Sequence, residues 1–435
     1  MSDDVNFKQN NAWRSKFRSR NHDIAHEQAP EVAHDLQGRE DIFRGKPVLI
    51  DKQEDLLALV ERLRAAGLFA YDSEFVGELS YVPKLCLIQI GTEQEIALVD
   101  PLAGLDLMPI WELLADESVE KIVHAGSQDM EPVLRLLGRP AANIFDTQIA
   151  AGFARLPYPI SLQRMVLQML GIRLGKGLTF TQWDQRPLSS QQVRYAADDV
   201  RFLPAVRREL HKVIDAAGSM AWVKQECAQT CDSTPYHFDR ETTYLRVRGS
   251  GTLDPRQLGM LRELAVWRDG EARNADVPPR TYLRDEIMIE LCRRAPKSEE
   301  ALLNIQGLPR PTRLSHSAAI LDAIGRGGQT PATKAAEMRK TDELPQQQFQ
   351  TDAIFVMAQM LCLARGVDPQ LAFTRSDLAE LLSVIRSDGA IEGVRLMQGW
   401  RGELVGEAIA KLCTKGGEVG VAVHAMELST TRLPE

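Results

Sequence analysis

The sequence lacks the usual marks of a secreted, a membrane-spanning or a zinc-binding protein. None of its six cysteines forms a C-x-x-C pair, so the common spacing of a zinc site is absent. Reduced thiols inside a cell are the expected state. No apolar run approaches the ~20 residues of a membrane span, and the N-terminus has no apolar segment typical of a secretory signal. We therefore expect a cytoplasmic protein that has no membrane partner.

A positive net charge is also missing. The 435 residues carry a formal net charge of −8, so the chain as a whole is not a basic nucleic-acid binder. This balance still permits a nucleic-acid substrate, because a metal-dependent nuclease gathers carboxylates at its centre and keeps basic residues in local patches. The length exceeds that of one compact core and indicates about two to four domains.

Residues 1–45 are polar and show no sustained periodicity. Basic residues with two aromatic ones between them gather there: Lys8, Trp13, Arg14, Lys16, Phe17, Arg18 and Arg20. One interpretation is a basic arm that touches an RNA backbone. The other, which we favour, is a solvated disordered tail.

Strand-like and helix-like patterns alternate over residues 46–235. EDLLALVERLRAAG is typical of a helix, LFAYDSEFV of a buried strand, and LCLIQIG with EIALVD of a hairpin. A helix (LMPIWELLAD), a strand (EKIVHAG) and an amphipathic helix (SQDMEPVLRLLG) follow, and the segment after them is mostly helical in period. This order predicts a mixed sheet covered by helices.

Two all-helical units are predicted after this region. The first covers residues 250–326 and begins with Asp254 as N-cap and Pro255 at the first helical position. Residues 326–346 resemble a linker. The second unit covers residues 345–415, and the segment from Lys415 to the end is weakly patterned.

Asp72 and Glu74 form a carboxylate pair inside an apolar run. Side chains two positions apart on a strand share a face, so both acids are expected to point the same way. A buried carboxylate pair is costly unless something compensates its charge, and hard oxygen ligands suit Mg²⁺ or Mn²⁺. Taken alone, the pair also fits a strand end that faces water.

Three further residues show spacings that are individually unremarkable. Asp129 follows a predicted strand and is placed in the first turn of the next helix, where an acid commonly complements the helix dipole. Tyr195 and Asp199 lie four residues apart and so share one helix face. Asp198 points about 100° away from Asp199 and is not expected to share its site.

Together these patterns are far more specific. Asp-x-Glu on a strand, Asp at a helix start and Tyr-x-x-x-Asp on a helix resemble the DEDD exonuclease superfamily, in its tyrosine subclass. The segments AYDSEFV, LCLIQIG, ALVDPL, VHAGSQDMEPV, FDTQIAAGF, TQWDQRPLS and YAADDVRFL resemble the ribonuclease D family over about residues 47–215. Arg194 stands where the histidine subclass has His. Ser73 replaces the usual Thr between the first two acids, a conservative change that is not expected to affect the metals.

The resemblance implies a ribonuclease H-like α/β nuclease domain with a mixed sheet flanked by helices. It implies 3′–5′ hydrolysis of RNA that releases nucleoside 5′-monophosphates, with tRNA precursors and other small structured RNAs as substrates. Two divalent ions, Mg²⁺ or Mn²⁺, are implied, held by Asp72, Glu74, Asp129 and Asp199. Tyr195 would position the attacking water. No obligate protein partner is evident.

Phe75 and His124 flank the acids and are candidate contacts to the terminal nucleotide. A core aromatic residue and a satisfied strand-end histidine stay open as alternatives. Asp146 is interpreted as a structural residue at a helix start.

Residues 250–326 resemble an HRDC domain over LGMLRELAVWRDGEARNADVPP and the text that follows, and residues 345–415 resemble a second, more diverged copy. Seven arginines of the first copy are candidates for an RNA-guiding patch or for a solvated face mixed with acids: Arg262, Arg268, Arg273, Arg280, Arg284, Arg293 and Arg294. Deletion of residues 250–435 is expected to weaken binding of structured RNA and to leave cleavage of short single strands.

Two other functions stay open. One is a 3′–5′ DNA exonuclease of the same superfamily, which the absence of a polymerase or helicase motif disfavours. The other is a catalytically silent nucleic-acid-binding adaptor, against which the complete set of acids argues. No residue demonstrably recognises a 2′-hydroxyl, so the preference for RNA rests on the resemblance.

Overall fold

The computed structural model describes residues 36, 39–77, 80–175, 182–231, 238–332, 345–415, 421–424 and 427–430 of the chain. Most of the predicted N-terminal extension, including all its basic and aromatic residues up to Arg20, therefore lies outside the described residues. No helix in the described ranges has the length and apolar character needed to cross a membrane.

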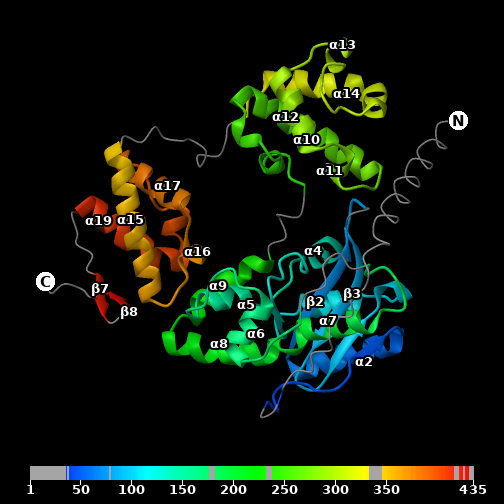
Figure 1. The fold of residues 1–435 in the computed structure, drawn as a ribbon, viewed down its shortest axis with the longest axis vertical. Coiled ribbons are helices and arrows are strands. Elements are labelled where there is room, and N and C mark those ends of the chain that lie inside the picture. The colour runs from blue at the N-terminus through cyan, green and yellow to red at the C-terminus, as the bar shows by residue number, and fades with distance from the viewer. Residues whose placement is uncertain are drawn as a thin grey trace. The chain divides into compact units, whose positions relative to one another are not determined.

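A six-stranded mixed sheet forms the centre of the nuclease region (Figure 1). Its spatial order is β1-β4-β3-β2-β5-β6, in which β2–β3 and β3–β4 pair antiparallel and the other neighbours pair parallel. The strands are β1 (Val48–Ile50), β2 (Leu68–Val76), β3 (Lys84–Gly91), β4 (Ile96–Val99), β5 (Glu120–Val123) and β6 (Ile144–Asp146). The predicted mixed sheet and hairpin are confirmed. The edge strands β1 and β6 escaped prediction because three residues are too few to show an alternation.

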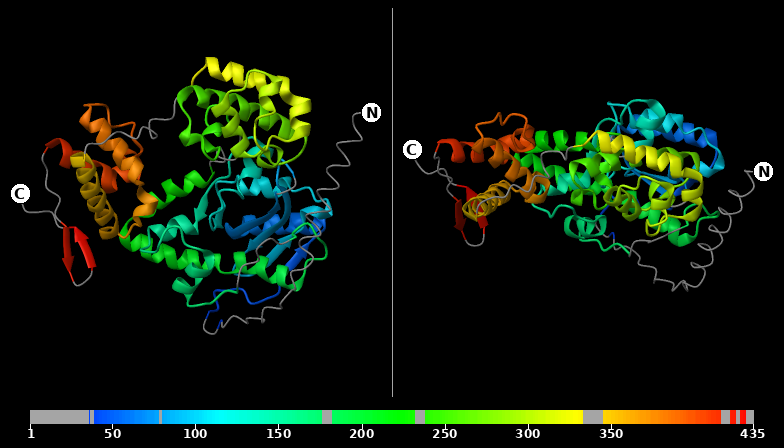
Figure 2. Two further views of the ribbon diagram at one scale, coloured as in Figure 1. Left: turned by 45° about the horizontal axis from the view of Figure 1, so that its top comes forward. Right: turned by 90° about the horizontal axis from the view of Figure 1, so that it is seen from above.

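Helices cover both faces of this sheet. Leu56 and Leu59 of α2 pack with Phe69 and Tyr71 of β2 on one face, while Ala196 of α7 packs on the other. The helices of this region are α2 (Gln53–Ala66), η1 (Pro101–Ala103), α3 (Met108–Leu114), α4 (Glu131–Leu137), α5 (Thr147–Gly152), α6 (Leu162–Leu170), α7 (Ser190–Arg201), α8 (Leu203–Ala217), α9 (Met220–Cys227) and η2 (Ala228–Cys231). Figure 2 shows the sheet and these helices from two further directions.

The first C-terminal unit is all-helical, as predicted. The Asp254 side chain accepts from the Gln257 amide at 2.9 Å, and the Gln257 side chain accepts from the Asp254 amide at 3.0 Å, which closes a capping box ahead of Pro255. Its elements are η4 (Thr243–Arg246), η5 (Ser250–Thr252), α10 (Pro255–Asn274), α11 (Pro279–Tyr282), α12 (Asp285–Arg294), α13 (Glu299–Leu302) and α14 (Arg310–Gln329), and they enclose a core of their own.

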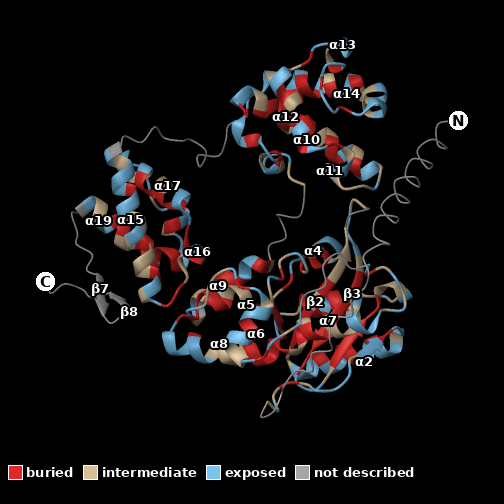
Figure 3. Cartoon of the chain, viewed as in Figure 1, coloured by how far each residue is buried: buried red, intermediate tan, exposed pale blue. Residues whose placement is uncertain are grey.

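The second unit is also helical. It comprises α15 (Pro345–Ala364), α16 (Pro369–Ala372), α17 (Arg375–Arg386), η7 (Arg395–Met397), α18 (Gly399–Arg401), the π-helical turn η8 (Gly402–Gly406) and α19 (Glu407–Lys415). The weakly patterned end contains two paired antiparallel strands, β7 (Val421–His424) and β8 (Glu427–Thr430), which the sequence did not predict. Figure 3 shows buried residues along one side of most helices in both units.

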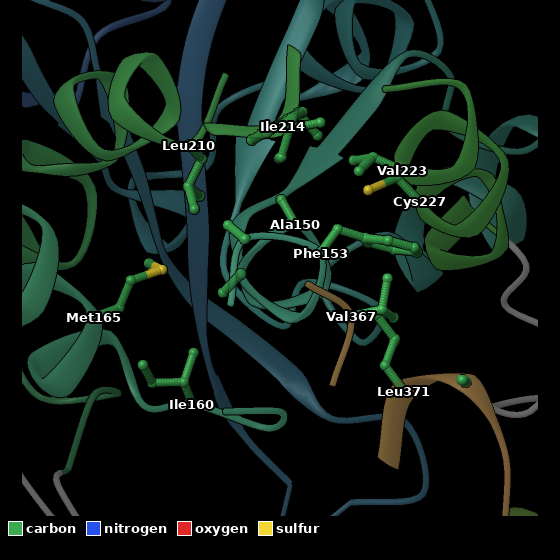
Figure 4. Close-up of a cluster of buried hydrophobic side chains, with 14 of the residues drawn as sticks. Ala150, Phe153, Ile160, Met165, Leu210, Ile214, Val223, Cys227, Val367 and Leu371 are labelled. Atoms are coloured by element: carbon green, nitrogen blue, oxygen red, sulfur yellow. The ribbon is translucent and has the colours of Figure 1, made fainter. Parts of the chain in front are cut away.

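The second unit shares a hydrophobic core with the nuclease region. One buried cluster joins Phe153 and Val223 of the nuclease helices to Val367, Leu371 and Trp400. Figure 4 shows Val367 and Leu371 beside Phe153. Deletion of residues 250–435 would therefore expose apolar surface of the nuclease itself, so weaker RNA binding by that deletion would not by itself identify these units as the RNA-binding surface.

A buried ion pair reinforces this shared core. Arg401 donates to both carboxylate oxygens of Glu226, at 2.7 and 2.8 Å, and the Trp400 indole donates to the same carboxylate at 2.8 Å. The Arg401 and Glu226 side chains are only 5% and 8% exposed. Loss of one partner would leave an uncompensated charge out of water, so the pair makes the nuclease region and the second unit depend on each other.

We predict that Arg401→Ala lowers the free energy of unfolding by about 3–5 kcal/mol, because Glu226 then keeps a buried charge without its counter-ion. Urea denaturation followed by circular dichroism measures the change. Arg375→Ala is the matched control, since the Arg375–Asp352 pair in the same unit is exposed and should contribute less than about 1 kcal/mol. Equal losses in the two variants would contradict the coupling.

Candidate active site

Strand β2 presents Asp72 and Glu74 on the sheet face that α7 covers. In the antiparallel pairing with β3, Asp72 lies opposite Gln89 and Glu74 opposite Leu87, and paired residues share a face. The register shifts between Glu74 and Phe75, and such a bulge redirects the side chains beside it. The predicted common orientation of the two acids follows from this strand geometry.

Helix α7 brings Tyr195 and Asp199 to the same face. A capping box of Ser189 and Gln192 begins the helix. The helix lies so close to β3 that a Cβ on Gly91 would stand 2.8 Å from the Val200 carbonyl oxygen. The neighbouring Asp198 turns away and pairs with Arg201 at 3.0 Å, as the helical spacing predicted.

Asp129 comes from a different part of the sequence than β2 and α7. It lies in the turn between β5 and α4, which begins at Glu131, and not in the first helical turn as predicted. The Ser73 hydroxyl donates a hydrogen bond to its carboxylate. This hydrogen bond ties the β5–α4 turn to the strand that carries Asp72 and Glu74.

Asp146 fixes the loop that carries Asp129. It caps α5 by accepting from the Gln148 amide at 2.9 Å, and it accepts from the Ala125 and Gly126 amides at 3.0 and 3.2 Å. Gly126 has no room for a side chain, since a Cβ would lie 2.6 Å from the Cβ of Val123. The predicted place of Asp146 at a helix start is confirmed, whereas its contact with this loop had no signal in the sequence.

The four acids perturb one another electrostatically. Desolvation and then the neighbouring Glu74 raise the pKa of Asp72 from 3.8 to about 7. Desolvation and Asp129 raise the pKa of Glu74 from 4.5 to about 7. Burial and the other carboxylates raise the pKa of Asp129 and of Asp199 well above the usual range. Such mutual perturbation requires that the acids lie close together in one poorly solvated region.

The donor set fits a divalent cation. All four groups offer hard carboxylate oxygens, and Asp199 Oδ2 is buried without a hydrogen-bond partner among the described residues. Across those residues no three His, Cys, Asp or Glu side chains already surround one metal position. The four acids thus offer ligand atoms of the kind that a divalent cation prefers, within one region of the fold.

The two predicted nucleotide contacts differ in availability. His124 has both ring nitrogens engaged, Nδ1 with the Thr147 hydroxyl and Nε2 with the Ile160 carbonyl, each at 3.0 Å. Burial lowers the pKa of His124 to about 4. Phe75 is half-buried and belongs to none of the apolar clusters formed by the described residues. Phe75 is therefore the more available stacking surface, and His124 has its hydrogen bonds satisfied.

Tyr195 remains a protonated phenol near neutral pH. Burial, followed by Asp199, Glu74 and Asp72, raises the pKa of Tyr195 above its usual value of 10.0. Its ring lies 6.1 Å from that of Trp183, centroid to centroid.

Arg186 clamps the segment after Trp183 to the sheet. Its guanidinium donates to both oxygens of Asp100 at 2.6 Å and to the Cys86 carbonyl at 2.7 Å. Asp100 follows β4 and Cys86 lies on β3, so these hydrogen bonds hold the segment from Trp183 to Arg186, which lies beside Tyr195, against two strands.

Comparisons with known proteins agree with this geometry. A family described as 3′–5′ exonuclease matches residues 47–215, and one described as HRDC domain matches residues 257–324. Ribonuclease D of Gluconacetobacter diazotrophicus is 36% identical over 84% of this chain and 92% of its own length. The chain belongs to the ribonuclease D family. Ribonuclease D of Acidiphilium cryptum is 32% identical over 89% of this chain and 98% of its own length.

The solved structures agree as well. The crystal structure of Escherichia coli RNase D matches with a TM-score of 0.73 at 29% identity, covering 86% of this chain and 100% of that one. Membership in the ribonuclease D family identifies the chain as a hydrolytic 3′–5′ exoribonuclease, and the nuclease family implies dependence on divalent metal ions. The predicted family and fold class are therefore confirmed.

We predict that Asp72→Asn stabilises this ribonuclease D family member in the presence of a chelator, in a pH-dependent way. The pKa of Asp72 is about 7 in the folded state and near 3.8 unfolded. The wild-type protein therefore loses stability as the pH rises from about 4 to above 7, and Asn escapes this loss. The gain in unfolding free energy should therefore be larger at pH 8 than at pH 5, by about 2–3 kcal/mol.

Urea denaturation at the two pH values measures this difference, and saturating Mn²⁺ should abolish the advantage of Asn at pH 8. Arg62→Gln, on the far surface of α2, serves as a control for general effects of charge. An advantage of equal size at both pH values would argue against repulsion among the acids.

Proposed function

We propose that the chain degrades RNA from a free 3′ end by a two-metal mechanism and releases nucleoside 5′-monophosphates. The observation that carries this proposal is the grouping of four half-buried carboxylates from β2, the β5–α4 turn and α7. Asp72 and Glu74 share one face of β2, Ser73 bonds Asp129 to the same strand, and Asp199 Oδ2 is buried without a hydrogen-bond partner among the described residues. Nothing in a stable fold favours such a cluster of like charges, so its function is to hold cations.

Asp72, Glu74 and Asp199 share the α7 face of the sheet and would be the inner ligands. Asp129, which the Ser73 hydroxyl holds to β2, would complete the set from the β5–α4 turn. Two Mg²⁺ or Mn²⁺ ions, when bound, would balance the four carboxylates and stabilise charge on the attacking and leaving oxygens of the phosphodiester.

Tyr195 positions the attacking water in this proposal. Its raised pKa makes the phenolate inaccessible near neutral pH, so the hydroxyl acts as a hydrogen-bonding group and not as a free base. It shares a helix face with Asp199, which places the phenol beside a cation ligand. Phe75 would stack on the terminal base. His124 would contact the nucleotide only through the face of its ring, because both ring nitrogens already form hydrogen bonds.

The substrates we propose are small structured RNAs with free 3′ ends, tRNA precursors among them. Structured RNA is the substrate class named for Escherichia coli RNase D, and tRNA precursors follow from the family resemblance in the sequence. The first HRDC-type unit offers less basic surface than its sequence suggested. Five of its seven candidate arginines pair with acids, namely Arg262, Arg268, Arg273, Arg280 and Arg294. This pairing favours the interpretation of a solvated, mixed-charge face over a dedicated RNA-guiding patch.

The deciding experiment compares matched RNA and DNA oligomers with free 3′ ends, labelled at the 5′ end, with and without Mg²⁺ or Mn²⁺. We expect a ladder of RNA shortened from the 3′ end, nucleoside 5′-monophosphate products, and no cleavage in EDTA. Faster cleavage of DNA would favour a DNA exonuclease, and binding without cleavage would favour a silent adaptor.

Two variants refine this test. Asp199→Asn should abolish cleavage, because no neighbour can replace its carboxylate. Tyr195→Phe should lower the single-turnover rate by about 10²-fold or more while it leaves the Kd for RNA within about threefold, because a positioned proton-transfer group acts mainly in the transition state. An unchanged single-turnover rate would exclude the positioning role of Tyr195.

A further inference from the structure

Two uncharged polar residues lie against the acids without being ligands themselves. Ser73 stands between Asp72 and Glu74 in the sequence, and Gln89 stands opposite Asp72 on the neighbouring strand. Both are buried, with 9% and 0% of their surface exposed. The sequence alone predicted no role for either residue.

Ser73 contacts two of the four acids at once. Its backbone amide donates to Asp72 Oδ1 at 2.9 Å, and its side-chain hydroxyl donates to Asp129 Oδ1. The two contacts use different groups of Ser73, its backbone amide and its side chain, so one residue links Asp72 on β2 to Asp129 in the β5–α4 turn. No other hydrogen bond found among the described residues joins Asp129 to the strand that carries Asp72 and Glu74.

We propose that Ser73 is a positioning residue that fixes Asp129 relative to Asp72 and so sets the spacing of the cation ligands. The inference rests on the proposed function and deepens it. Asp129 lies in a turn, whereas Asp72 lies on a sheet strand, so the hydroxyl ties the less constrained ligand to the more rigid one. Partners that orient metal ligands are typically worth 10–100-fold in metal affinity or activity.

The test compares Ser73→Ala, which removes the hydroxyl, with Ser73→Thr, which keeps it. Two quantities are measured on the full chain: the Mn²⁺ concentration that half-maximally raises the unfolding temperature, and the single-turnover rate on an RNA oligomer. We expect Ser73→Ala to raise the first and lower the second, each about 10-fold or more, and Ser73→Thr to stay within about threefold of wild type.

The thermal readout does not depend on cleavage, which separates the two proposals. If wild type cleaves RNA and Ser73→Ala matches it in both measurements, the role of Ser73 is overturned and the proposed function stands. If Mn²⁺ stabilises wild type without any cleavage, the proposed function fails, and the thermal shift of Ser73→Ala still decides the role of Ser73. If Mn²⁺ neither stabilises wild type nor supports cleavage, both proposals fail.

Gln89 supports a second, independent inference. Both atoms of its side-chain amide are buried and have no hydrogen-bond partner within the part of the chain that the structure describes. The residue lies between Asp72 on β2 and Leu98 on β4, on the face that α7 covers. A buried amide without partners destabilises a protein, whereas an apolar residue of the same shape would not.

The same face holds another buried atom without a partner, Asp199 Oδ2. We infer that the Gln89 amide donates to the Asp72–Asp199 pair once cations draw these carboxylates together. The amide has N–H donors for a carboxylate, and Leu or Met at this position has none. The unpaired Gln89 amide thus destabilises the cation-free protein, and this unfavourable free energy is removed when cations bind.

Gln89→Leu separates this role from simple packing. We expect a higher unfolding temperature than wild type in EDTA, a Mn²⁺ midpoint raised about 10-fold, and a single-turnover rate lowered about 10-fold or more. Leu87→Met is the matched control, because Leu87 is equally buried and lies opposite Glu74 on the same face. It should stay within about threefold of wild type in both measurements.

A Gln89→Leu variant with wild-type Mn²⁺ midpoint and wild-type rate would overturn the role of Gln89. Equal losses in Gln89→Leu and Leu87→Met would assign the effect to packing and overturn it as well. Neither outcome bears on the proposed function, which the wild-type assay decides separately.

Discussion

The nuclease region has to accommodate one electrostatic constraint, which is the repulsion among the carboxylates of Asp72, Glu74, Asp129 and Asp199. Four carboxylates that raise one another's pKa stay within one region because a rigid scaffold carries them. A six-stranded sheet between two layers of helices provides that rigidity. The close approach of α7 to β3 at Gly91 fixes Asp199 against the strand that carries Asp72.

The candidate ligands come from β2, a turn and α7, and neutral polar residues lie around them. Ser73 bonds Asp129 and Asp72, and Gln89 lies opposite Asp72 on β3, so both are placed to align the proposed ligands. Asp146 has a similar role at a greater distance from the acids, because it binds the loop that carries Asp129 through two backbone amides. Alignment of the acids is thus distributed over residues that never touch a cation.

The C-terminal helices contribute to the same rigidity. Residues 345–415 bury Trp400 against Phe153 and pair Arg401 with Glu226, so some of the nuclease core comes from the other end of the chain. Residues 254–330 differ, because they enclose their own core and pair most of their arginines internally. The two helical units therefore contribute differently to the stability of the chain: the first encloses its own core, and the second shares the core of the nuclease.

The sequence by itself determined the family, the mixed sheet, the helical units and which acids to propose as ligands, because spacing along one strand or helix fixes a shared face. Only the tertiary structure decided which neighbours support those acids. Gln89 faces Asp72 because of strand register, and Arg401 meets Glu226 across 175 positions. Register and long-range packing depend on the summed free energy of the whole core, which no local window of sequence contains. For the same reason the segment 250–435 looked separable in the sequence, while its last helices belong to the nuclease core.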